Sequence, residues 1–187
     1  MSVLVPVPET AEAEKKINEK IIDFDNRFFD DFNFKSGVLK DLTYRIELPY
    51  PLEEFSFKKN CYCVIERMEG DVAGSYNDYR ITLPPDAKDD LILHEMIHAH
   101  IDMLVKQPPL SFFSEYLMFY LYKSLKKKIK QLDMMIRIQG EYWHVRKQPY
   151  CHGLLFFLKS LDLDIRLNLP LGTVYGDDVG WDVEDLD

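Results

Sequence analysis

Cysteine is scarce in this 187-residue sequence, and long apolar runs are missing from it. The three cysteines, Cys61, Cys63 and Cys151, are an odd number and suggest no disulfide framework. No apolar stretch approaches the roughly 18 residues that a membrane span needs. Residues 1–16 also have no apolar core long enough for a signal peptide. These absences predict an intracellular, cytoplasmic protein (nuclear if the source is eukaryotic) that does not enter a membrane.

What the sequence does contain is an ordinary globular composition, with 47% hydrophobic and 29% charged residues. This composition argues against disorder throughout, and the length suits one domain. Apolar residues at three- and four-residue steps predict helices, and alternating ones predict strands. The expected helices cover 11–34, Leu91–Val105, Ser111–Leu125 and Gly153–Leu161, and the expected strands cover Leu42–Leu48, Cys61–Glu66 and Tyr79–Leu83. This order predicts an α+β domain over residues 1–170, with an inserted helical segment at about 106–145 and an acidic tail at 171–187.

Charge is unevenly distributed along the chain. The net charge of −9 argues against indiscriminate binding to nucleic acid. Eight Lys and Arg residues against Asp133 and Glu141 nevertheless give +6 between Lys123 and Lys147. This basic segment is either a solvated helix surface, which is the interpretation we favour, or a face that contacts phosphates. Such a face would consist of Lys123, Lys126, Lys127, Lys128, Lys130, Arg137 and Lys147.

The segment that carries chemistry is His94-Glu95-Met96-Ile97-His98, an HExxH motif within an apolar helix. Residues four apart lie on one helix face, so His94 and His98 can direct imidazole nitrogens at one Zn²⁺ ion. Glu95 flanks the ion and is placed to act as the general base that activates water. A buried helix would hardly contain two histidines and a glutamate without partners for them. His100 lies about 200° around the helix from His98, and we expect it on the surface or behind the ligands.

A catalytic zinc site needs a third protein ligand, and four residues are candidates. His152 is the first choice because it precedes Gly153 at the expected start of a helix, where the backbone can approach closely. The alternatives are Glu115 on the following helix, His144 in an aromatic stretch, and Asp177 in the tail.

Four blocks of this sequence resemble the SprT-like metallopeptidases, the group that includes Spartan-type proteases of DNA–protein crosslinks. They are Phe24–Phe29, Gly74–Leu83, Asp90–Ala99 and His152-Gly153-x-x-Phe156, and they span roughly residues 20–160. The resemblance implies a zincin-like fold, Zn²⁺ as cofactor and His152 as third ligand. His98 and His152 are 54 positions apart, which is longer than is typical, and no Cys-x-x-Cys pair for a zinc ribbon follows.

We therefore expect a zinc-dependent endopeptidase that cleaves protein substrates. In a narrower version of this expectation, the substrates are proteins associated with DNA. An edge strand beside the site helix can bind the substrate backbone in zincin-type folds, and Tyr79–Leu83 is either that edge or a plain structural strand. One alternative is an effector or toxin protease acting on a specific host protein. Another is a non-catalytic zinc-binding interaction module, against which the presence of Glu95 argues. The sequence predicts no oligomeric state.

Overall fold

The computed structural model describes residues 8–33, 38–39, 62–65, 74–77, 80–105, 111–146 and 152–176. The helices are α1 (Pro8–Phe28), the 3₁₀ helix η1 (Asp30–Phe32), α4 (Asp89–Val105), α5 (Ser111–Lys126), α6 (Leu132–Arg146) and α7 (Leu154–Leu167), and the strands are β1 (Tyr62–Ile65), β2 (Ser75–Asn77) and β3 (Arg80–Leu83). The strand expected over Leu42–Leu48 lies outside the described residues. The described part is therefore mostly helical with a small sheet, as the α+β expectation requires in outline.

The three strands form a mixed sheet in the order β1-β3-β2. β1 pairs with β3 in parallel, and β2 pairs with β3 antiparallel. The expectation that Tyr79–Leu83 is a free edge is wrong, because Arg80–Leu83 is the central strand. The edge that lies against α4 belongs to β2, a strand of only three residues that is too short for alternation to reveal it.

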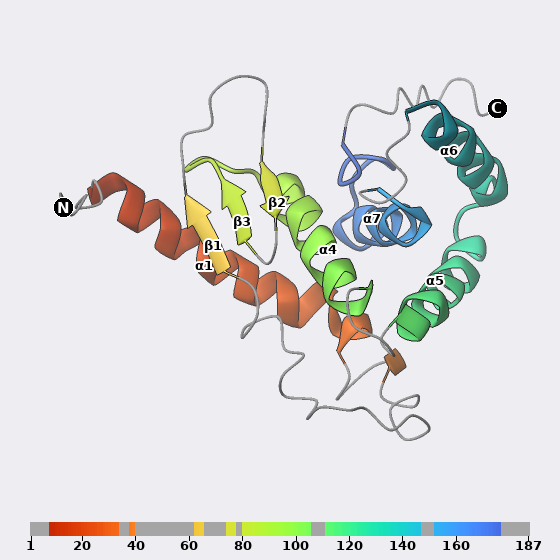
Figure 1. Cartoon of the computed structure of the whole chain (residues 1–187), viewed down its shortest axis with the longest axis horizontal. Helices are drawn as coiled ribbons and strands as arrows, with labels where there is room; N and C mark the ends of the chain where they lie inside the picture. Colours follow the sequence, from red (N-terminus) through yellow and green to blue (C-terminus); the bar gives the residue numbers. More distant parts are fainter. Residues whose placement is uncertain are drawn as a thin grey trace.

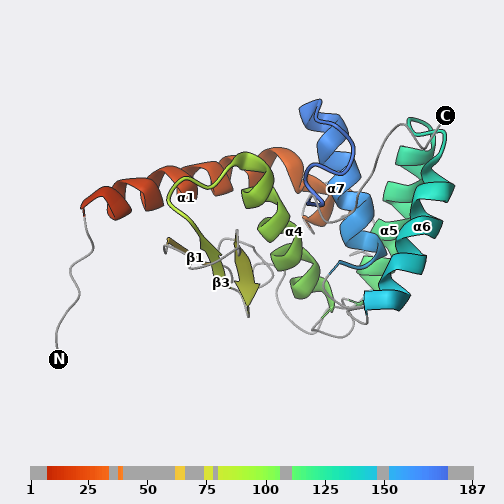
Figure 2. The same ribbon diagram turned by 90° about the horizontal axis from the view of Figure 1, so that it is seen from above.

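Helix α4 lies at the centre of the molecule, between the sheet and α7 (Figures 1 and 2). α1 runs lengthwise beside both the sheet and α4, and α5 packs against α4 and α7. The position of α4 explains its composition, since it is covered on several sides. Two successive turns of α4 contribute four residues with no exposed surface, which are Ile92, Leu93, Met96 and Ile97.

The amphipathic pattern expected at the N-terminus places α1 correctly against this core. Ile17, Ile21, Phe24 and Phe28 follow three- and four-residue steps, and all are buried. The helix ends at Phe28, earlier than the expected boundary near residue 34, and η1 continues the chain.

The basic segment forms a turn and a second helix. α5 ends at Lys126, and backbone N–H groups of Lys128 and Ile129 donate to the Leu125 carbonyl. α6 then continues through Gly140 to Arg146. Among the helices described, none has the length and apolar character needed to cross a membrane.

Candidate metal centre

Three histidines from two parts of the chain converge. His94 and His98 lie one turn apart on α4, and His152 lies two residues before the first residue of α7. One potential ligand atom from each lies within 4.8 Å of the others. The Nε2 atoms of His94 and His152 are 3.2 Å apart. These three residues therefore could hold one metal ion.

The spacing of the ring nitrogens suits a small tetrahedral cation. With Zn–N bonds of about 2.0–2.1 Å, two ligands of a tetrahedral ion are about 3.3 Å apart. The 3.2 Å between Nε2 of His94 and of His152 is close to that value. Burial lowers the pKa of His94, and burial together with the neighbouring His94 and His152 lowers the pKa of His98 to about 3. The rings of His94 and His98 are therefore neutral, which is the form of imidazole that binds metals.

A single aromatic ring packs against all three histidines. The ring centroid of Phe156 lies 4.9 Å from that of His94, 4.5 Å from that of His98 and 4.7 Å from that of His152. Phe156 is on the first turn of α7 and is 1% exposed. This apolar wall restricts the rotation of the imidazoles and keeps water from one side of the cluster. The sequence showed Phe156 as part of a motif, but not this packing role.

Glu95 is buried next to the histidine cluster and is not a member of it. Burial raises the pKa of Glu95 to about 7. Its Oε2 atom is buried without a hydrogen-bond partner among the described residues. Gly74 lies so close that a Cβ there would be 3.1 Å from Glu95 Oε1. A carboxylate held in this way is poised to exchange a proton rather than to complete an ion pair.

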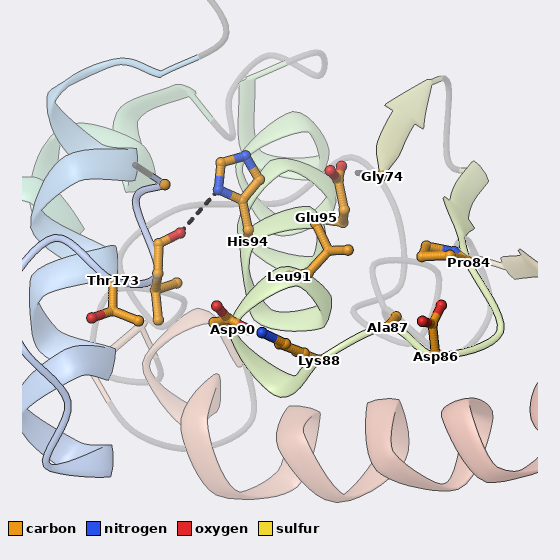
Figure 3. A pocket seen from close by; sticks show the side chains of 12 residues that line it. Gly74, Pro84, Asp86, Ala87, Lys88, Asp90, Leu91, His94, Glu95 and Thr173 are labelled. Atoms are coloured by element: carbon orange, nitrogen blue, oxygen red, sulfur yellow. Dashed lines mark hydrogen bonds between the residues drawn. The ribbon is translucent and has the colours of Figure 1, made fainter. Parts of the chain in front are cut away.

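Glu95 and His94 both line a cleft of about 640 Å³. Gly74 and Pro84 border the cleft on one side, and Thr173 borders it on the other (Figure 3). The view shows Glu95 directed toward Gly74 and His94 directed toward the segment that contains Thr173. The cleft therefore gives a ligand access to Glu95 and His94 together.

Residues 169–176, most of which the sequence assigned to a tail, contribute to this site. The Nδ1–H of His94 donates to the Val174 carbonyl over 2.9 Å. The Tyr175 ring lies 5.5 Å from that of His152, and both Val174 and Tyr175 are buried. Neither residue follows a helix or strand period, so the only signal in the sequence was the pair of glycines, Gly172 and Gly176, that flanks them.

The other candidate residues do not join the cluster or cannot be placed. Glu115 is exposed on α5 and belongs to no group of potential ligands among the described residues. The side chain of His144 and the whole of Asp177 lie outside the described residues. The expected surface position of His100 is wrong, because its side chain is 3% exposed and its Nδ1 and Nε2 face the Met96 carbonyl and the Asp25 carboxylate.

Comparison with family models, with curated proteins and with solved structures gives no match for this chain. Any statement about its activity therefore depends on the site geometry and on the motifs in the sequence.

Proposed function

We propose that this chain is a zinc-dependent endopeptidase of the SprT-like type, with a zincin-like fold. The observation that carries the proposal is the convergence of His94, His98 and His152 beside the buried carboxyl of Glu95 at one cleft. Three imidazoles leave a fourth coordination position open, which is typical of catalytic rather than structural zinc. A purely structural site would also have no use for Glu95.

The proposed roles follow from the donor set. His94, His98 and His152 would hold Zn²⁺, which supplies a Lewis acid for the scissile carbonyl and lowers the pKa of a bound water to roughly 7. Glu95 takes a proton from the attacking water and delivers it to the nitrogen of the leaving amine. Its pKa of about 7 in the buried state suits both transfers near neutral pH.

The fold offers an extended binding mode for a peptide substrate. Among the described strands, β2 is at one edge of the sheet, and Gly74, which directly precedes it, lies against Glu95. A peptide added to this edge would form backbone hydrogen bonds without requiring a particular sequence. Backbone recognition of this kind would suit an endopeptidase acting on unfolded segments of proteins.

A narrower form of the proposal has DNA-associated proteins as substrates. Lys127, Lys128 and Lys130 are exposed around the turn between α5 and α6. Lys126 pairs with Asp133 and Lys123 lies over the Phe119 ring, so those two cations are partly engaged within the protein. Binding to duplex DNA that weakens steeply with salt, and that is lost in the triple variant Lys127→Ala/Lys128→Ala/Lys130→Ala, would support this form. Absent or salt-independent binding would remove it.

The main test combines metal analysis with cleavage of an unfolded casein. The wild-type protein should bind one Zn²⁺ and cleave the casein, and Glu95→Gln should retain the metal while its activity falls by about 10²–10⁴-fold. Glu115→Gln, an exposed carboxyl on α5, is the matched control and should leave cleavage unchanged. Full activity in Glu95→Gln would contradict the mechanism. Stoichiometric zinc without any cleavage by the wild type would favour a non-catalytic module.

A further inference from the structure

A buried carboxylate on α7 organises the segment that follows this helix. Asp164 has no exposed surface. Its Oδ2 accepts the backbone N–H of Gly172 over 2.7 Å, and its Oδ1 accepts that of Val174 over 3.0 Å. The backbone carbonyl of Asp164 also accepts the N–H of Leu169 over 2.8 Å. One residue thus fixes both the end of the helix and the shape of the turn that comes back toward it.

The same turn then contacts two of the three histidines. The Val174 carbonyl accepts the Nδ1–H of His94, and the Tyr175 ring packs against His152 while its hydroxyl donates to the His152 carbonyl over 3.5 Å. The turn closes where Gly176 N–H donates to the Gly172 carbonyl over 3.1 Å. Gly176 has φ +103°, and a Cβ there would lie 3.9 Å from His94 Cε1. The turn is therefore built against the ring of His94.

We infer that Asp164 is a positioning residue for the metal centre, acting through Val174 on the tautomer and orientation of His94. The inference rests on the proposed metal site but not on proteolysis. An imidazole whose Nδ1–H is donated to a carbonyl carries its lone pair on Nε2, the atom that faces His152. Without the two hydrogen bonds to Asp164, the N–H groups of Gly172 and Val174 would lose these acceptors, and the turn would hold the Val174 carbonyl toward His94 less firmly.

A nearby carboxylate provides a contrast on the same helix. Asp162 is 8% exposed and lies 3.3 Å from Lys159 and 3.7 Å from Arg166. Its partners belong to the ion-pair network near η1, not to the turn at 169–176. A general effect of removing a buried negative charge from α7 would appear in Asp162→Asn and Asp164→Asn alike. A positioning effect would appear only in Asp164→Asn.

The closing experiment measures Zn²⁺ affinity by competition with a chelator, together with the ¹⁵N spectrum of the histidine rings in the metal-free protein. Asp164→Asn can accept only one of the two N–H groups, and we expect its Zn²⁺ affinity to fall by about 10–100-fold. In the metal-free spectrum, His94 should change from the single Nδ1–H tautomer to a mixture. Asp162→Asn should leave both readouts as in the wild type.

The possible outcomes separate this inference from the proposed function. Unchanged affinity and an unchanged His94 tautomer in Asp164→Asn would overturn it, as would equal losses in Asp162→Asn and Asp164→Asn. A wild-type chain that binds no Zn²⁺ would refute the proposed function, whereas the tautomer measurement would still test the link from Asp164 to His94. If Asp164→Asn does not fold, Gly176→Ala serves in its place, because a side chain at φ +103° strains the turn. That variant should also lose at least 10-fold in affinity, and wild-type affinity would overturn the inference.

Discussion

Two histidines of α4, His94 and His100, differ in the groups that their ring nitrogens face. Both ring nitrogens of His100 face protein oxygens, from Met96 and Asp25, and its ring stacks on Phe29 with centroids 4.1 Å apart. His94 also has one nitrogen on a protein carbonyl, but its other nitrogen faces a second imidazole nitrogen. The fold therefore provides oxygen partners for both ring nitrogens of His100, the structural histidine. For His94, the site histidine, it provides one such partner and leaves Nε2 beside another imidazole, where a metal ion could bind.

The charged groups show the same division. On the η1 side, Lys159 has no exposed surface, and its ammonium contacts both carboxylate oxygens of Asp31 at 2.8 Å and the Phe28 carbonyl at 2.6 Å. On the cleft side, Oε2 of Glu95 is buried without such a partner among the described residues. Since uncompensated polar groups are costly to bury, Glu95 should lower the stability of the cleft side, and the proposed role of its carboxyl would explain why this cost is kept.

The largest expected effect is on the free energy of unfolding and tests the buried ion pair between Lys159 and Asp31. Lys159→Met should lower the free energy of unfolding by about 3–5 kcal/mol, because it leaves Asp31 buried without its cation. Burial already raises the pKa of Asp31 against the opposing effect of Lys159. Urea unfolding measures the loss, and Lys126→Met, which breaks the exposed pair with Asp133, should leave the urea midpoint nearly unchanged. Zinc stoichiometry should be unchanged in both variants.

The next expected effect is on the Zn²⁺ affinity of the histidine cluster. His98→Gln should reduce Zn²⁺ affinity by about 10²–10³-fold, because the roughly 10–16 kcal/mol with which four protein ligands bind a structural zinc ion corresponds to about 3–4 kcal/mol per ligand. Chelator competition measures the change, and the metal-free variant should unfold at nearly the wild-type urea concentration. Equal affinities for wild type and His98→Gln would show that the three histidines do not bind the metal together.

His100→Gln is the reciprocal control on the same helix. It removes the stack on Phe29 and the contact with Asp25, so the free energy of unfolding should fall by about 1–3 kcal/mol. Its Zn²⁺ affinity should equal that of the wild type. A loss of affinity here would contradict the division of α4 into a structural histidine and site histidines.

The sequence alone was sufficient to predict the helix that contains His94 and His98, because an HExxH motif within an apolar run is typical of a buried helix. His94 and His98 share a face for reasons of helical geometry, and His152 was identified by its Gly153 neighbour and by the resemblance of its block. The contacts around them depended on the chain returning from far away. The Val174 carbonyl reaches His94 across 80 positions, and nothing in the local pattern specifies such a contact.

Burial of polar residues was the other feature that periodicity could not predict. His100 was expected on the surface or behind the ligands, because its position around the helix is directed away from the ion. The prediction took no account of α1, η1 and the residue between them, which supply Asp25, Phe32 and Phe29 to enclose it. For the same reason β2 was missed, since three residues become a strand only through pairing with β3.

A third effect follows from the pKa of Glu95 in the metal-free protein. Burial raises that pKa from 4.5 to about 7, so folding favours the protonated carboxyl. The associated stability is fully present below pH 4.5 and is lost as the pH rises through 7. At pH 8 with chelator, Glu95→Gln should therefore be more stable than the wild type, by up to about 3 kcal/mol. At pH 5 the two should nearly coincide, and Zn²⁺ should close the gap at pH 8; a gap independent of pH would contradict the buried carboxyl.

The smallest expected effect on stability comes from a substitution of Gly74, which lines the cleft beside Glu95. A Cβ at this position would lie 3.1 Å from Glu95 Oε1, 3.1 Å from Leu91 Cδ1 and 3.3 Å from Leu83 Cδ2. The neighbours must move by a few tenths of an ångström, and the reduced freedom of the unfolded chain offsets part of that cost, so the free energy of unfolding should change by less than about 1 kcal/mol. The displaced carboxylate should nevertheless lower kcat on casein several-fold with Zn²⁺ affinity unchanged, whereas Ser75→Ala, one residue along, should alter neither. If Gly74→Ala lost metal rather than turnover, Glu95 would belong with the ligands and not apart from them as the base.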